Sequence, residues 1–255
     1  MVKENERVDD LQLKGFKIIQ DPAKFCFGID AVLLSGFADV RKGDTVMDLG
    51  TGTGIIPILL AGKTLAQSIY GVDIQPDMIE MAGRSILLNK LESRVFITQM
   101  DIKDIGGENT HLKKRSFDVV TSNPPYKKAG SGLINPDDSK AVARHELLCS
   151  LGDVICAAAF LLKVGGRLEM VHRPERLADI FYAMRQANIE PKRVQMVYSN
   201  YNKPPSLTLV EGVLGGRPSL KWLPPLFIYD SEGNYTKEVR ALYGCSRCKA
   251  EGLKI

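Results

Sequence analysis

The segment Asp48-Leu49-Gly50-Thr51-Gly52-Thr53-Gly54 joins a predicted strand to a predicted helix. Residues 45–49 are typical of a buried strand, and residues 55–65 are typical of a helix. Glycines at such a turn let the backbone bend tightly and lie close to a ligand. The spacing is Gly-x-Gly-x-Gly, and Ile55 stands where a dinucleotide-binding loop has its third glycine or alanine. The segment therefore predicts a ligand near the backbone, but its spacing disfavours NAD.

Predicted strands and helices alternate along the rest of the chain. Strands are expected at residues 45–49, 68–72, 94–98, 117–121, 166–171, 194–198 and 206–214, and helices at residues 30–37, 55–65, 76–89, 140–162 and 176–187. This alternation indicates an α/β fold, with a mostly parallel seven-stranded sheet and helices on both faces. The two late strands indicate an antiparallel edge. A further strand is expected within residues 11–19, and residues from Trp222 onward are expected to form an irregular tail.

The chain has 255 residues, which suits one large domain with modest extensions. We expect an N-terminal extension at residues 1–43, a core domain at 44–220 and a packed tail at 221–255. A composition of 44% hydrophobic and 25% charged residues excludes a disordered or fibrous chain. The net charge of +4 permits an anionic partner without demonstrating one.

The sequence gives little indication of a metal site, a membrane-spanning segment or disulfide bonds. The three histidines form no His-x-x-x-His pattern, and Cys245 and Cys248 form a lone Cys-x-x-Cys pair, so no metal site is expected. The five cysteines are an odd set, typical of reduced thiols. The longest apolar run, residues 154–162, is far shorter than the ~20 residues of a membrane span. With a charged N-terminus, these features predict a cytoplasmic protein that does not bind membranes.

Three acidic residues accompany successive predicted strands. Asp48 lies in the first strand, Asp73 closes the second and Asp101 follows the third, so all three should lie at the carboxyl edge of a parallel sheet. Asp73 can accept hydrogen bonds from ribose hydroxyls, and Asp101 can accept one from an adenine amino group. S-adenosylmethionine is a nucleoside with a sulfonium charge and no phosphate, so it suits this acidic edge. The predicted cofactor-binding residues are Asp48, Gly50, Gly52, Gly54, Asp73 and Asp101.

The segment Ser122-Asn123-Pro124-Pro125-Tyr126 follows the fourth of these strands. Its two prolines stiffen the loop and remove two amide donors. The side-chain oxygen of Asn123 and the carbonyl of Pro124 can each accept one N–H of a planar amine. These two bonds localise the nitrogen lone pair, which can then attack a methyl sulfonium without a strong general base. Tyr126 offers a face for stacking the target ring.

The glycine loop and the Asn-Pro-Pro-Tyr motif together resemble the class I, Rossmann-like methyltransferases that modify an amino group on a planar system. The segment Phe25-Cys26-Phe27-Gly28-Ile29-Asp30-Ala31-Val32-Leu33-Leu34 is similar to one in bacterial tRNA adenine-N6 methyltransferases, which act on position 37 of a valine tRNA. Ala143-Arg144-His145-Glu146 and Asn234-Tyr235-Thr236 resemble that family too. The resemblance covers nearly the whole chain, with Gly28 where many relatives are expected to have serine or threonine.

The resemblance implies specific roles for the two motifs. Asn123, Pro124 and Tyr126 would bind and stack the amine, the glycine loop with its acidic residues would hold S-adenosylmethionine, and the N-terminal extension would cover the cofactor cleft. Lys127 and Lys128, beside Pro125 in the same loop, are the favoured contacts to RNA. The other candidate phosphate contacts are Lys113, Lys114, Arg115, Lys237, Arg240, Arg247 and Lys249.

We predict methyl transfer to the exocyclic N6 of an adenine in RNA, with position 37 of a valine tRNA implied by the resemblance. One alternative is a protein glutamine-N5 methyltransferase that acts on a release factor. However, only ~43 residues precede the first core strand, where those enzymes have a larger helical domain. A second alternative is an RNA-binding module without activity, which intact Asp48, Asp73 and Asn123 disfavour. A DNA adenine methyltransferase is disfavoured because the chain shows no separate target-recognition domain.

Overall fold

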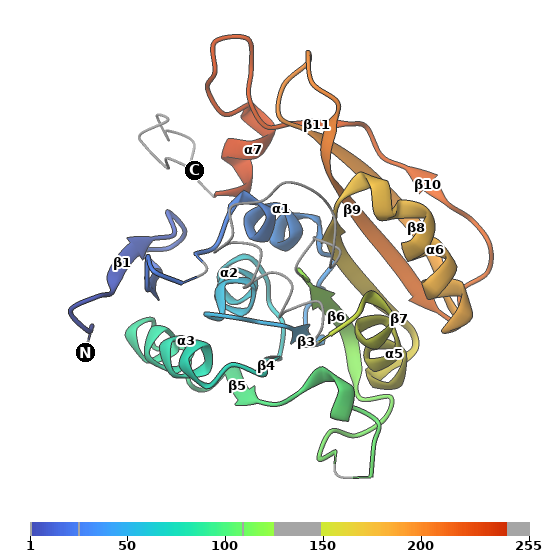
Figure 1. Cartoon of the computed structure of the whole chain (residues 1–255), viewed down its shortest axis with the longest axis horizontal. Coiled ribbons are helices and arrows are strands. Elements are labelled where there is room, and N and C mark those ends of the chain that lie inside the picture. Colours follow the sequence, from blue (N-terminus) through green and yellow to red (C-terminus); the bar gives the residue numbers. More distant parts are fainter. Residues whose placement is uncertain (1, 25, 109, 125–148, 244–255) are drawn as a thin grey trace.

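The computed structural model describes residues 2–24, 26–108, 110–124 and 149–243. These residues form a nine-stranded sheet with helices on both faces, and a separate two-stranded hairpin near the N-terminus (Figure 1). The strands are β1 Arg7–Asp10, β2 Lys17–Gln20, β3 Thr45–Leu49, β4 Ser68–Asp73, β5 Val95–Gln99, β6 Phe117–Ser122, β7 Leu162–His172, β8 Ile189–Tyr198, β9 Pro205–Leu214, β10 Lys221–Trp222 and β11 Leu226–Phe227. The helices are α1 Ile29–Phe37, α2 Ile55–Lys63, α3 Pro76–Leu88, α5 Leu151–Leu161, α6 Leu177–Gln186 and α7 Lys237–Leu242, with 3₁₀ turns η1 Ile102–Asp104 and η2 Pro174–Arg176.

The strand order of the large sheet is β10-β8-β9-β7-β6-β3-β4-β5, and β11 also pairs with β8. Strands β7, β6, β3, β4 and β5 all run parallel to one another. Strand β9 is antiparallel to both β7 and β8. This confirms the mostly parallel sheet with an antiparallel edge. The seven predicted strands are β3 to β9, and β10 and β11 extend the sheet by two residues each.

Two local predictions differ from the structure. The strand expected within residues 11–19 is the second strand of a hairpin, and residues 11–16 form its turn, where Gln12 and Lys14 have positive φ. The helix expected at residues 140–162 is described only from α5 onward, because residues 125–148 lie outside the described part. α5 begins at Leu151 because Ser150 and Asp153 form a reciprocal capping box at its N-terminus.

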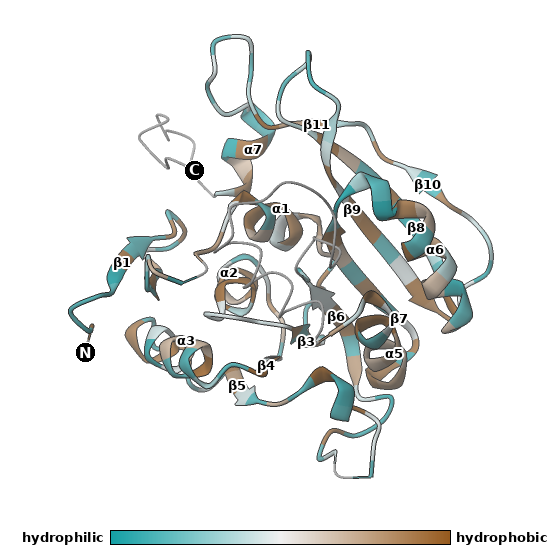
Figure 2. Cartoon of the chain, viewed as in Figure 1, coloured by the Kyte–Doolittle hydropathy of each residue, from teal (hydrophilic) through white to brown (hydrophobic). Residues whose placement is uncertain are grey.

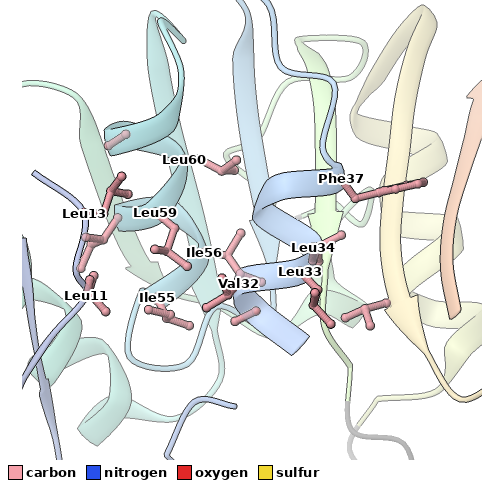
Figure 3. Close-up of a cluster of buried hydrophobic side chains, with 14 of the residues drawn as sticks. Leu11, Leu13, Val32, Leu33, Leu34, Phe37, Ile55, Ile56, Leu59 and Leu60 are labelled. Carbon is pink, nitrogen blue, oxygen red and sulfur yellow. The ribbon is translucent and has the colours of Figure 1, made fainter. Parts of the chain in front are cut away.

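Two hydrophobic cores lie on opposite faces of the sheet. One core is formed under α1 and α2, and the other under α5 and α6. Figure 3 shows the first, in which side chains of α1 and α2 face one another. Leu11 and Leu13 of the hairpin turn are buried in the same core, so the N-terminal segment packs on α2 (Figure 3). Figure 2 shows apolar residues concentrated on α5 and along β9, and polar residues on the outside of α3.

The tail after β9 packs against the domain. Val239 of α7 is completely buried, and Leu242 lies against Gly36 of α1. Thr236 caps α7 and also donates its hydroxyl to the carbonyl of Phe227 at 2.7 Å. Across the described ranges, no helix is long and apolar enough to cross a membrane.

Candidate active site

The glycine loop connects β3 to α2 and lies against β4. The N–H groups of Gly50 and Thr51 both donate to the carbonyl of Val72 at 2.9 Å. Gly52 and Gly54 have φ of +54° and +78°, a left-handed conformation that favours glycine. A Cβ at Gly54 would also lie 3.2 Å from that of Ala82 on α3. The glycines therefore allow both the turn and the close packing of α3.

Asp73 ends β4 and holds the glycine loop. Its Oδ2 accepts the N–H of Gly52 at 2.9 Å, and its Oδ1 accepts the N–H of Gln75 at 2.9 Å. The residue is 7% exposed. Each carboxylate oxygen can accept more than one hydrogen bond, so both retain acceptor capacity. Asp73 is thus placed to fix the loop and to bind hydroxyl groups of a ligand beside it.

Asp48 lies in β3, in register with Gly71 of β4 and Thr121 of β6, and is completely buried. Its Oδ1 accepts the Thr121 hydroxyl at 2.7 Å. The buried hydroxyl of Thr51 also interacts with the Asp48 carboxylate, and among the described residues no other group bonds to that hydroxyl or to Oδ2. Burial raises the pKa of Asp48 to about 7, although the interactions with the hydroxyls of Thr121 and Thr51 oppose this rise. Because Asp48 is completely buried, it would affect a ligand only by fixing the end of β3 before the glycine loop, not as a direct contact.

The raised pKa of Asp48 predicts a pH-dependent stability. Because its folded pKa of about 7 lies above the ordinary value of 3.8, the folded state binds more protons between these values. The free energy of unfolding should therefore fall as pH rises from about 4 to about 7. At ~1.4 kcal/mol per pH unit, this interval corresponds to at most roughly 4 kcal/mol.

The variant Asp48→Asn tests this effect, since an amide can accept from Thr121 without titrating. We expect urea denaturation at pH 4.5 and pH 8 to show a smaller loss of stability in Asp48→Asn than in the wild type. Some pH dependence should remain, because burial and neighbouring Glu211 raise the pKa of Glu169 to about 8. Equal losses in wild type and variant would contradict the assignment to Asp48.

Asn123 and Pro124 leave β6 beside the glycine loop. Ser122 pairs in register with Leu49, and its hydroxyl donates to the Leu49 carbonyl at 2.9 Å. The next residues, Asn123 and Gly50, therefore leave adjacent parallel strands at the same edge. Asn123 and Pro124 are both half-buried. The sheet order thus brings the predicted amine-binding residues next to the predicted cofactor loop.

Asp101 follows β5, two strands from β3 along the same edge. Its Oδ1 accepts the N–H of Lys103 at 2.9 Å and caps the 3₁₀ turn η1. The side chain is only partly buried, so its other oxygen remains available to a ligand. The predicted cofactor-binding residues therefore lie within or directly after the adjacent strands β3, β4 and β5.

Other predicted residues fall outside the described part. Pro125, Tyr126, Lys127 and Lys128 belong to residues 125–148, so their roles stay predictions. The same holds for residues 143–146, and for Cys245, Arg247, Cys248 and Lys249 in the tail. Among the described residues, no group of three or more histidine, cysteine or acidic side chains is arranged to hold a metal ion.

Sequence reasoning assigned no role to three polar residues in or beside these strands. Thr51 and Thr121 accompany Asp48, and His172 ends β7 beside β6. The Nδ1 of His172 accepts the N–H of Arg173 at 2.8 Å, and burial lowers the pKa of the imidazole to about 4. His172 is thus neutral at physiological pH. A polar residue at an inward position of an otherwise apolar strand is the signal that marks Thr121.

The fold and this sheet edge define a class I S-adenosylmethionine-dependent methyltransferase. A family model described as "Methyltransferase domain" matches residues 40–196. Among solved structures, a predicted O-methyltransferase from Agrobacterium tumefaciens has a TM-score of 0.68 at 21% identity, covering 84% of this chain and 95% of its own. A geranyl diphosphate methyltransferase in complex with SAM has a TM-score of 0.52 at 15% identity, covering 72% and 84%.

Relatives with a named activity identify a more specific family. A tRNA1(Val) (adenine(37)-N6)-methyltransferase of Porphyromonas gingivalis is 31% identical over 207 residues, 80% of each chain. One of the same name from Tolumonas auensis is 28% identical over 238 residues, 90% of this chain and 92% of its own. The chain belongs to the methyltransferase domain family and, within it, to the sequence family of these tRNA1(Val) (adenine(37)-N6)-methyltransferases.

Proposed function

We propose that this enzyme transfers a methyl group from S-adenosylmethionine to the exocyclic N6 of an adenine in tRNA, and that position 37 of a valine tRNA is its target. The observation that supports this most is the position of Asn123 and Pro124, one strand from the glycine loop and tied to β3 through Ser122 and Leu49. The relatives named for this reaction support the choice of substrate.

The proposed chemistry uses hydrogen-bond acceptors instead of a strong base. S-adenosylmethionine supplies an electrophilic methyl group. The Asn123 side-chain oxygen and the Pro124 carbonyl would accept the two N–H groups of the adenine amine and direct its lone pair toward the cofactor loop. Asp48, Gly50, Gly52, Gly54, Asp73 and Asp101 would form the cofactor site. The left-handed glycines of the loop and the Asp73 carboxylate, which keeps acceptor capacity, fit a nucleoside that lies close to the backbone.

The remaining expectations belong to the same proposal. Tyr126 would stack the target base, and Pro125, Lys127 and Lys128 would contact the RNA. Residues 1–43 would cover the cofactor cleft, beside the core domain at 44–220 and the tail at 221–255. Because its proposed substrate is tRNA, we also propose that the enzyme works in the cytoplasm.

The test is a methyl-transfer assay with radiolabelled S-adenosylmethionine and bulk tRNA from cells that lack the gene. We expect label in N6-methyladenosine after digestion to nucleosides. Bulk tRNA from cells that retain the gene is the matched control, and it should accept little label because its target is already methylated. Valine tRNA transcripts with adenine or guanine at position 37 then test the site itself.

The possible results of these assays distinguish between the candidate functions. Label in both position-37 transcripts would contradict the specific target but keep the RNA reaction. Label in a release-factor glutamine and none in RNA would replace the proposal with protein methylation. RNA binding without turnover, and without dependence on the cofactor, would favour a binding module.

A further inference from the structure

A cluster of aromatic side chains, one of them exposed, lies at the loop between β8 and β9. We call Tyr198, Tyr201 and Phe227 the aromatic platform. The ring of Tyr201 stacks on that of Phe227, with centroids 4.1 Å apart and an interplanar angle of 30°. Phe227 also contacts the ring of Tyr198, with centroids 5.2 Å apart. Tyr201 is nevertheless 66% exposed, so one face of its ring is covered and much of the rest meets solvent.

Backbone hydrogen bonds hold this loop in place. The N–H of Asn202 donates to the side-chain oxygen of Asn200 at 3.0 Å, which forms an Asx turn with Tyr201 at its centre. On the other side, the segment after Phe227 is bonded to the loop: the N–H of Ile228 donates to the carbonyl of Tyr198 at 2.8 Å. A ring that is fixed before binding loses little conformational entropy when a ligand stacks on it.

The platform lies at the same sheet edge as Asn123. β8 and β11 run parallel to β6 and β7, so their carboxyl ends reach that edge together (Figure 1). The path from β6 through β7, β9 and β8 to β11 crosses four strand spacings of ~4.8 Å, or roughly 19 Å. At ~3.4 Å per stacked nucleotide, this is the length of about five or six nucleotides of one strand.

Two cations lie in the segments next to the platform. Arg173 follows β7 directly and donates from Nη1 to the Ser206 carbonyl at the start of β9, at 3.2 Å, while remaining exposed. Lys203 is exposed in the loop itself.

We propose that the aromatic platform, with Arg173 and Lys203, binds unpaired nucleotides of the RNA substrate about five or six positions from the methylated adenine. One base stacks on Tyr201, and the two cations contact phosphates. Unpaired bases stacked on aromatic side chains beside basic residues are the usual mode of single-stranded RNA recognition. This inference rests on the proposed function, since it places a second part of the same substrate.

The experiment compares Tyr201→Ala, Tyr201→Trp and Tyr182→Ala. Tyr182 on α6 is a matched control because it is 69% exposed. We expect Tyr201→Ala to weaken tRNA binding by about 5- to 100-fold, the usual effect of removing one base–aromatic stack. KM for tRNA should rise, whereas kcat and the affinity for S-adenosylmethionine should stay near wild type. Tyr201→Trp should retain binding, and Tyr182→Ala should have no effect.

A second variant tests the proposed contact between Lys203 and an RNA phosphate. In Lys203→Ala, the slope of log K against log salt concentration should become shallower by about 0.7, as expected for the loss of one contact to a single-stranded phosphate. Unchanged tRNA affinity in Tyr201→Ala would overturn the proposal, and an unchanged slope in Lys203→Ala would exclude the phosphate contact of Lys203.

The wild-type assay separates this inference from the proposed function. If the wild type methylates no RNA, the proposed function fails before any variant is made. If it methylates RNA and Tyr201→Ala binds that RNA normally, only the platform fails. If Tyr201→Ala weakens binding of a polypeptide substrate and leaves RNA binding unchanged, the platform is a protein-binding surface and the proposal is overturned.

Discussion

The variant Asn123→Ala is expected to lose about 10²–10³-fold in kcat, the usual effect of removing one preorganised hydrogen-bond partner at a reacting centre. Asn123 leaves β6 directly after Ser122, whose hydroxyl is tied to the Leu49 carbonyl at 2.9 Å. The adjacent strands hold the start of this loop in register with the glycine loop. Without the amide oxygen, the adenine amine would lose one of its two acceptors, and its lone pair would stay conjugated with the ring.

Single-turnover methyl transfer with saturating tRNA is the measurement, because it isolates the chemical step from product release. The affinity for S-adenosylmethionine should stay within about twofold of wild type, since Asn123 is proposed to contact the amine and not the cofactor. Asn123→Asp is the matched variant: it keeps the shape and an oxygen acceptor, and should retain more activity than Asn123→Ala. Wild-type rates in Asn123→Ala would exclude the proposed role.

The sequence was sufficient for the fold and for the edge of the sheet that holds the site. The apolar strand before Gly50, the following helix and the repeat of this pattern determine a parallel sheet, because each crossover must bury its helix on the sheet. Asp73 and Asn123 were predictable at one edge for the same reason, since each directly follows or ends a strand. The structure adds the order of the strands, which makes Asn123 a neighbour of the glycine loop.

Contacts between distant residues could not be predicted in the same way. The hydrogen bond from Thr121 to Asp48 joins residues 73 positions apart, and no local pattern indicates it. β10 and β11 have only two residues each, too few to show a period. The start of α5, in contrast, had a readable signal in Ser150 and Asp153, which have the spacing of a capping box.

The variant Asp73→Ala is expected to raise the Kd for S-adenosylmethionine by at least ~10²-fold. Two hydrogen bonds from ribose hydroxyls to a carboxylate would be lost, each contributing ~1.5–3 kcal/mol. Isothermal titration gives the Kd. Asp77→Ala is a control for loss of charge, because Asp77 lies at the start of α3 with its side chain 69% exposed. Its expected effect on the Kd is small.

A loss of affinity in Asp73→Ala could also follow from a displaced loop, since Asp73 accepts the N–H of Gly52 at 2.9 Å. A cofactor analogue that lacks both ribose hydroxyls distinguishes the two causes, because the pair of changes forms a double-mutant cycle. If Asp73 binds the hydroxyls, the wild type loses affinity for the analogue and Asp73→Ala loses little more. If Asp73 only fixes the loop, the two losses add, and the carboxylate then acts on the cofactor through the position of Gly52.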